Sequence, residues 1–171
     1  MLRYFFVFFF IFFYTIFSNA NEKIAFIDID KIINGSNLGK KLNIELDKKI
    51  KKENDLLIAE EKKLKDKEIE ILNQKNILSE DELNKKISKL RDEINNYRNK
   101  KLKIDNEFRD IKLKQTNSLV SSLNTILSNY AEKNSISLIV QKKYIVVGKT
   151  ELDITNDILK VFNEEVKSIN K

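Results

Sequence analysis

A long stretch without helix breakers constrains this chain more than any other feature. The sequence contains no proline, and from Lys40 to Tyr130 it contains no glycine. Instead it is a dense mixture of Lys, Glu, Asp, Leu and Ile, which is typical of long helices exposed to water. One start signal interrupts the stretch, because Ser79 and Glu82 have the spacing of a capping box. We therefore expect two long helices that meet just before Ser79.

Heptad patterns predict that the two helices pack as an antiparallel hairpin. In the first helix an apolar residue recurs at every seventh position, at Ile50, Leu57, Leu64, Ile71 and Leu78. The second core position of each heptad, four residues later, we call the companion position, and it is polar: Asn54, Glu61, Glu68 and Lys75. In the second helix apolar residues alternate at spacings of four and three, as in a coiled-coil seam, at Leu83, Ile87, Leu90, Ile94, Tyr97, Ile104, Phe108 and Ile111. The first helix thus offers a thinner apolar stripe than the second.

A turn at residues 78–80 brings the two stripes into register. Equal distances from the turn place Ile71 opposite Ile87, Leu64 opposite Ile94, Ile50 opposite Phe108 and Leu46 opposite Ile111, and these pairs predict a seam formed by Ile50, Leu64, Ile71, Ile87, Ile94 and Phe108. Leu57 would face Lys101, whose side chain can lie along its partner with the ammonium in water. Arms of about 40 residues are roughly 60 Å long at about 1.5 Å per residue. The hairpin must therefore project into solvent.

Both ends of the chain predict a small base that contains strands. Residues 23–29 form a short apolar, β-branched run, and Asp30 to Gly35 reads as a helix cap, one helical turn and a glycine stop, with Ser36 or Asn37 as the next cap. Residues 137–141 and 144–148 predict two further short strands or a hairpin. Asp153 opens a last helix whose apolar face is Ile154, Ile158, Val161, Phe162 and Val166.

The predicted fold is α+β and mostly α, a long helical hairpin inserted in a small β-containing hub. We assign residues 21–36 and 135–171 to the hub and residues 37–134 to the hairpin arms. We expect the apolar residues of the hub to form its core and an interface between copies: Ile24, Phe26, Ile29, Leu138, Val140, Val146 and Phe162. A single copy would leave too much of this surface exposed, which favours an oligomer.

The first twenty residues have the pattern of a signal peptide. Arg3 precedes an apolar run from Tyr4 to Phe17, and the small residues up to Ala20 suit a signal peptidase. An uncleaved anchor is the alternative, but the run is shorter than the roughly 20 residues of a membrane-spanning helix. We expect an exported protein of 151 residues with a net charge of +5.

Missing residue types argue against an enzyme. The chain has no histidine and no cysteine, which removes the commonest metal ligands and the commonest general base, and its three glycines form no phosphate-binding loop. Asp28 and Asp30 could be read as a pair of catalytic carboxylates, but a capping role suits them better. We expect no enzyme activity, no cofactor and no metal site.

Three segments give the sequence a specific resemblance. Residues 23–41 (KIAFIDIDKIINGSNLGKK), the strand residues 139–140 and 145–147, and residues 153–160 together resemble the Skp/OmpH family of periplasmic chaperones. The resemblance implies a homotrimer whose strands share a β-hub, with three hairpins around a central cavity. It also implies the function, which is to hold unfolded outer-membrane β-barrel proteins after export, without ATP, until they are inserted in the membrane.

Surface charge suggests which residues and which partners make contact. Four basic residues after the turn, Lys85, Lys86, Lys89 and Arg91, are candidates for contact with a client or with lipid head groups, although such runs are more often solvated faces. The pI of about 9.3 also allows an anionic membrane surface as a partner. Nucleic acid is not expected, since no aromatic-basic platform is present. A structural or adaptor coiled coil of the cell envelope is the alternative to a chaperone.

Overall fold

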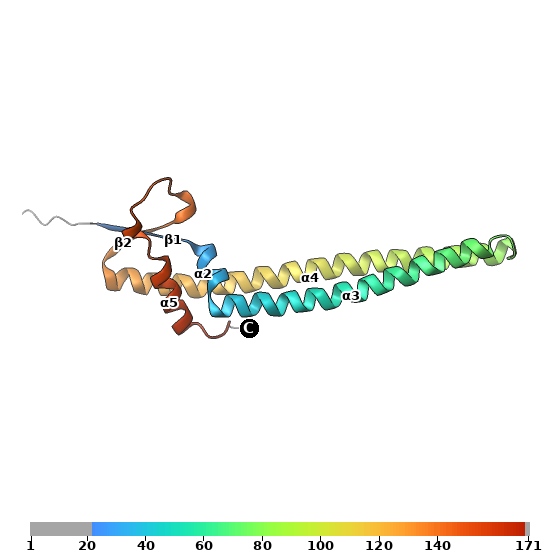
Figure 1. Ribbon diagram of the computed structural model, residues 1–171, viewed down its shortest axis with the longest axis horizontal. Helices are drawn as coiled ribbons and strands as arrows, with labels where there is room; N and C mark the ends of the chain where they lie inside the picture. The colour runs from blue at the N-terminus through green and yellow to red at the C-terminus, as the bar shows by residue number, and fades with distance from the viewer. Residues whose placement is uncertain (1–21, 170–171) are drawn as a thin grey trace, which may run out of the picture.

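A computed structural model describes residues 22–169, and the predicted signal peptide lies outside these residues. The described chain consists of a long helical hairpin with a small mixed hub at one end, as Figure 1 shows. The predicted fold class is thereby confirmed.

The hairpin is formed by α3 (Asn37–Gln74) and α4 (Glu80–Asn134), joined by a short turn at residues 75–79. Ser36 caps α3, because its hydroxyl accepts a hydrogen bond from the Gly39 amide at 3.0 Å. Ser79 caps α4, and the predicted capping box with Glu82 is present. The two helices run side by side from the hub to the turn (Figure 1).

The seam between the arms differs in one respect from the sequence-based prediction. The predicted companion positions Asn54, Glu61, Glu68 and Lys75 are exposed, whereas Glu53, Glu60 and Gln74 are half-buried. Of the predicted companions, Glu61 accepts a hydrogen bond from the Tyr97 hydroxyl across the arms at 3.2 Å. Three further contacts across the arms use the third residue after an apolar position, and of these residues Lys67 is exposed. At this spacing Glu60 binds Lys100 at 2.6 Å, Lys67 binds Glu93 at 2.7 Å and Gln74 accepts from Lys86 at 2.6 Å. Polar pairs across the arms therefore alternate with apolar residues along the seam.

The hub contains a parallel sheet of two strands, β1 (Lys23–Ile27) and β2 (Ile136–Gln141). Strand β1 ends two residues earlier than predicted. Asp28, rather than Asp30, caps helix α2 (Ile29–Gly35), since its carboxylate accepts from the Lys31 amide at 2.9 Å. The sequence could not separate the two aspartates, because both precede a helix-compatible segment.

The second predicted C-terminal strand is wrong for the single chain. After β2 come a 3₁₀ turn, η2 (Lys142–Tyr144), and an irregular loop up to a second 3₁₀ turn, η3 (Thr150–Leu152). In Figure 1 this loop arches away from the sheet. Within residues 22–169, β1 and β2 are paired only with each other and, at Phe26, with Asp153. Residues 144–148 therefore have strand-type sequence without a strand to pair with.

The core of the molecule lies where the hub meets the base of the hairpin. Helix α5 (Thr155–Glu165) lies across the base of α4 (Figure 1) and turns its apolar face inward. The cluster is built from both ends of the chain and includes Ala25, Ile27, Ile32, Ile33, Leu38, Leu119, Leu123, Ile126, Ile158 and Phe162. Burial of side chains of this size stabilises the fold by about 1.5–3 kcal/mol each.

Gly39 makes the join between α2 and α3 possible. A Cβ atom at this position would lie 1.8 Å from the carbonyl oxygen of Ile33 and 2.8 Å from the hydroxyl oxygen of Ser36. Only glycine therefore lets α3 start so close to the end of α2. This turn aims the hairpin away from the hub.

Candidate binding surfaces

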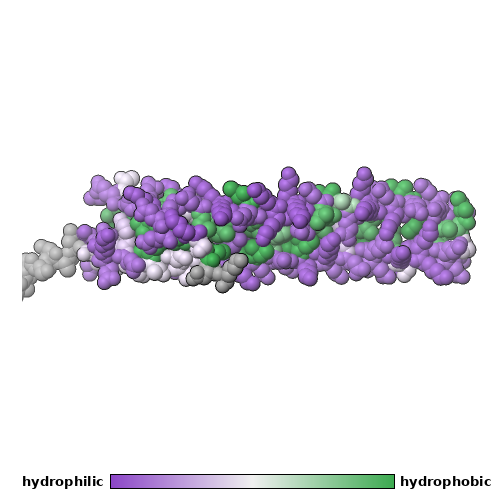
Figure 2. Space-filling view, turned by 90° about the horizontal axis from the view of Figure 1, so that it is seen from below, coloured by the Kyte–Doolittle hydropathy of each residue, from purple (hydrophilic) through white to green (hydrophobic). Residues whose placement is uncertain are grey.

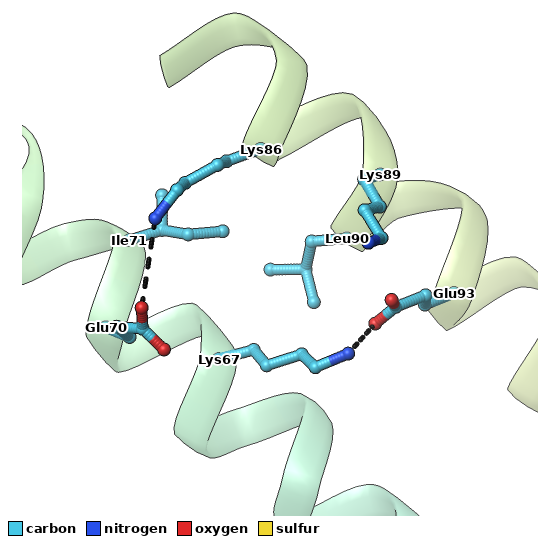
Figure 3. Close-up of a pocket in the computed structure, with 7 residues that line it drawn as sticks. All are labelled: Lys67, Glu70, Ile71, Lys86, Lys89, Leu90 and Glu93. Atoms are coloured by element: carbon cyan, nitrogen blue, oxygen red, sulfur yellow. Dashed lines mark hydrogen bonds and ion pairs between the residues drawn. The ribbon is translucent and has the colours of Figure 1, made fainter. Parts of the chain in front are cut away.

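The turn end of the hairpin holds a crevice between the two arms. The crevice has a volume of about 240 Å³ and is lined by the seven residues drawn in Figure 3: Lys67, Glu70, Ile71, Lys86, Lys89, Leu90 and Glu93. Ile71 and Leu90 project into it from opposite arms. Ion pairs bridge the arms on either side, Lys67 to Glu93 at 2.7 Å and Lys86 to Glu70 at 3.8 Å. The crevice combines an apolar floor with charged walls.

The four basic residues predicted as contacts have different surroundings. Lys86 is bound across the arms by Gln74 and Glu70, so it serves the hairpin itself. Lys89 lines the crevice. Lys85 and Arg91 are exposed and take part in none of the ion pairs formed within residues 22–169. Lys85, Lys89 and Arg91 thus remain accessible to a binding partner.

The predicted seam residues are only partly shielded from water. Ile50, Leu64, Ile71, Ile94 and Phe108 are half-buried, and Ile87 is 39% exposed. Beyond Leu46 towards the turn, Leu57 is the one apolar residue of the described arms that is fully buried, at 4% exposure. Lys101, its predicted partner, is exposed, and the neighbouring Lys100 makes the bond to Glu60. The arms are therefore held by a thin seam.

Apolar side chains also occur on the outside of the arms, which the seam analysis did not detect. Figure 2 shows apolar patches along the length of the hairpin, between charged ridges. The exposed apolar residues of the hairpin that are not seam residues are Ile44, Leu56, Ile58, Ile69, Leu72, Ile77, Leu102 and Leu113. Ile77, at the turn, is 82% exposed. Their signal was present in the sequence as apolar residues out of phase with the seam.

The hub residues predicted to form a core fall into two groups. Phe26 and Phe162 are buried, and Ile29 and Val140 are half-buried. The other three are exposed: Ile24 at 48%, Leu138 at 53% and Val146 at 99%. Ile24 and Leu138 are neighbours in the sheet register. The hub thus presents an apolar surface on its sheet and the adjoining loop.

A polar network fixes the loop that follows β2. The Asp153 carboxylate accepts from Lys142 at 2.7 Å and from the Thr155 amide at 3.0 Å, and the Thr155 hydroxyl accepts from the Asp28 amide at 2.9 Å. Burial works to raise the pKa of Asp153, but the hydrogen bonds from Lys142 and Thr155 outweigh it and lower the pKa below its ordinary value. The Lys142 ammonium also lies 5.8 Å from the centre of the Phe26 ring. These contacts tie the start of α5 to both strands.

Between residues 22 and 169, no helix is both long and apolar enough to cross a membrane. The same residues contain no group of three or more acidic side chains arranged as metal ligands.

Comparison with known proteins agrees with this geometry. The sequence model described as outer membrane protein (OmpH-like) matches residues 23–162. The chain belongs to the OmpH-like family. This is a family of chaperones and not a class of enzymes. No curated protein matches the chain.

A solved structure has the same fold. The crystal structure of a candidate outer membrane chaperone (OmpH-like) from Caulobacter crescentus CB15 has a TM-score of 0.79 and 17% sequence identity, and the match covers 88% of this chain and 89% of that one. The hub and the projecting hairpin are thus shared at low sequence identity.

Proposed function

We propose that this OmpH-like protein is an ATP-independent holdase of the periplasm. After export and removal of residues 1–20, it binds unfolded outer-membrane β-barrel proteins and keeps them soluble until they are inserted in the membrane. Family membership supports the chaperone class.

The observation that carries the proposal is the dispersal of apolar side chains on the outside of a projecting hairpin. Ile58 is 64% exposed and Leu72 is 63% exposed, and charged residues separate them. Scattered apolar residues do not form the large patch that would make the protein itself aggregate. They do offer many weak contacts to an unfolded chain, and weak contacts allow release without ATP.

A homotrimer is part of the proposal. The exposed hub residues Ile24, Leu138 and Val146 form an apolar surface that a second copy can cover. Residues 144–148 have strand-type sequence but no strand partner in the single chain, so pairing with a neighbouring hub gives them one. Two strands alone make a marginal sheet, and further strands stabilise it. Three hairpins on one hub would then enclose a client.

The test is suppression of client aggregation. The mature protein is mixed with several unrelated outer-membrane β-barrel proteins unfolded in urea, the urea is diluted without ATP, and turbidity is followed. A holdase keeps each unfolded barrel in solution and does not bind the same barrels once folded. Unchanged turbidity for all of them would refute the proposal.

An adaptor coiled coil is the second candidate, favoured by the long projecting shape of the arms (Figure 1). An adaptor binds one folded partner in a fixed ratio and gives no protection against aggregation. Comparing folded with unfolded barrels in the same assay therefore separates the two functions. Anionic vesicles, added as a competitor, test whether a membrane surface is a further partner.

A further inference from the structure

A second regular stripe runs along the outside of α3. Counting from Ile44 in steps of four and three residues up to Leu72 gives a set of positions at which every residue is exposed. We call this the α3 outer stripe, and its members are Ile44, Lys48, Lys51, Asp55, Ile58, Lys62, Lys65, Ile69 and Leu72. Since successive helical residues are about 100° apart, the stripe lies roughly 150° around the helix from the seam with α4.

Charge is sorted onto this stripe. It carries Lys48, Lys51, Lys62 and Lys65 but only one acid, Asp55, while every other acid of α3 between Ile44 and Leu72 lies off it. Within residues 22–169 none of the four lysines forms a side-chain hydrogen bond or an ion pair, and the ion pairs between the arms use Lys67, Lys86 and Lys100. The stripe is thus a row of apolar residues and available cations.

The dimensions of the stripe suit an extended chain. From Ile44 to Leu72 it spans about 42 Å at about 1.5 Å per residue. An extended polypeptide covers that distance with about a dozen residues at about 3.3 Å each. A transmembrane β-strand has about 9–11 residues. One unfolded barrel strand therefore fits along the stripe.

Other occupants fit less well. Along the stripe, two lysines and an aspartate lie between Ile44 and Ile58. The apolar residues therefore form a single row and no broad apolar face that could enter a bilayer. A folded protein needs about 800 Å² of surface on each partner, which is wider than one row of side chains. An unfolded segment is itself one chain wide.

We infer that the α3 outer stripe is the surface that binds the client, and that it selects extended segments in which apolar residues alternate with acidic ones. The lysines bind the carboxylates while Ile58, Ile69 and Leu72 contact the apolar side chains. The inference rests on the proposed holdase function and adds the face of the arm and the charge of the segment.

A matched pair of variants tests the inference in the full mature protein. The stripe variant is Ile58→Ser, Lys62→Glu and Lys65→Glu. The control is Leu56→Ser, Lys49→Glu and Lys63→Glu, which makes the same chemical changes on another exposed face of α3, where Leu56 is 51% exposed. Circular dichroism checks that both variants keep their helices.

The measurement is the affinity for a fluorescent, urea-unfolded outer-membrane β-barrel after dilution. We expect the Kd of the stripe variant to rise at least tenfold and to lose most of its salt dependence, and that of the control to change less than threefold. Equal affinities in the two variants, with the wild type binding, would overturn the stripe and leave the holdase function intact. Absence of binding by the wild type would refute the holdase function itself.

Site-specific crosslinking gives a second readout that does not depend on charge reversal. Because the chain has no cysteine, Ile58→Cys and Leu56→Cys can each carry a single photoactivatable label. The label at position 58 should crosslink the unfolded barrel several-fold more than the label at position 56.

Loss of binding to anionic vesicles in the stripe variant, with client affinity retained, would assign the stripe to a membrane surface and overturn the inference.

Discussion

The hub and the hairpin are stabilised in different ways. Where the hub meets the base of the hairpin, Ile32, Leu123, Ile158 and Phe162 are completely buried. In the arms between Leu46 and the turn, one leucine is fully buried among the described residues, and polar pairs join the arms at Glu60, Lys67 and Gln74. The difference shows that the hub carries most of the folding free energy. The hairpin keeps its apolar side chains near the surface, where they are available for binding.

The largest expected effect is in the hub. Phe162→Ala removes a ring with 0% exposure from the centre of the core. It should lower the free energy of unfolding by about 3–5 kcal/mol, because a cavity is left behind. Urea unfolding followed by circular dichroism measures the loss. A decrease below about 1 kcal/mol would contradict the assignment of the core to the hub.

A smaller effect is expected in the arms. Leu57→Ala truncates the best-buried arm residue, at 4% exposure, and should cost about 2 kcal/mol, the low end for such changes, because the thin seam can close around the gap. The control Leu56→Ala, at 51% exposure, should change the stability by less than about 0.5 kcal/mol. Equal effects of the two variants in thermal unfolding would show that the seam is misplaced.

Acid should weaken the hub network when Asp153 takes up a proton. The pKa of Asp153 is lowered in the folded protein, so its contribution to stability is present above the ordinary value of 3.8 and is lost as the pH falls through the lowered pKa. The melting temperature should therefore drop as the pH falls below the ordinary value of 3.8 and through the lowered pKa. Asp153→Asn should reduce that drop and lower stability at pH 7. A variant with the wild-type pH profile would exclude a role for this carboxylate.

The smallest effect concerns the ion pairs across the arms. Lys67 and Glu93 are 2.7 Å apart, but their side chains are 51% and 28% exposed. A double-mutant cycle with Lys67→Ala and Glu93→Ala should give a coupling energy of about 0.2–1 kcal/mol, which decreases at high salt. A coupling energy above about 2 kcal/mol would mean that the hairpin depends on its charges as much as the hub depends on its core.

The hairpin could be predicted from the sequence because its signals are local. Ser79 and Glu82 mark the start of α4, and the absence of glycine and proline between Lys40 and Tyr130 leaves few alternatives to a helix. Apart from Glu61, which bonds Tyr97, the companion positions of the seam were misplaced by one residue, because spacings of three and four both lie on one helical face. Only the packed geometry shows that Glu60 and Lys67 reach across to the other arm.

The hub was harder to predict because its contacts are distant in the sequence. Strand β1 pairs with β2 more than a hundred residues later, and residues 144–148, which were predicted as a strand, form part of a 3₁₀ turn and an irregular loop. The α3 outer stripe was visible as a pattern, but its meaning depends on which face of α3 the other arm covers. Sequence alone does not give that face.

The central claim is that the hub assembles the protein while the hairpins hold an unfolded client. The most direct test mixes the mature protein with an urea-unfolded outer-membrane β-barrel, dilutes the urea, and measures the mass of the soluble species by light scattering after size exclusion. The account predicts one soluble complex that contains three chains and one client. A client that precipitates beside an unoccupied oligomer would contradict it.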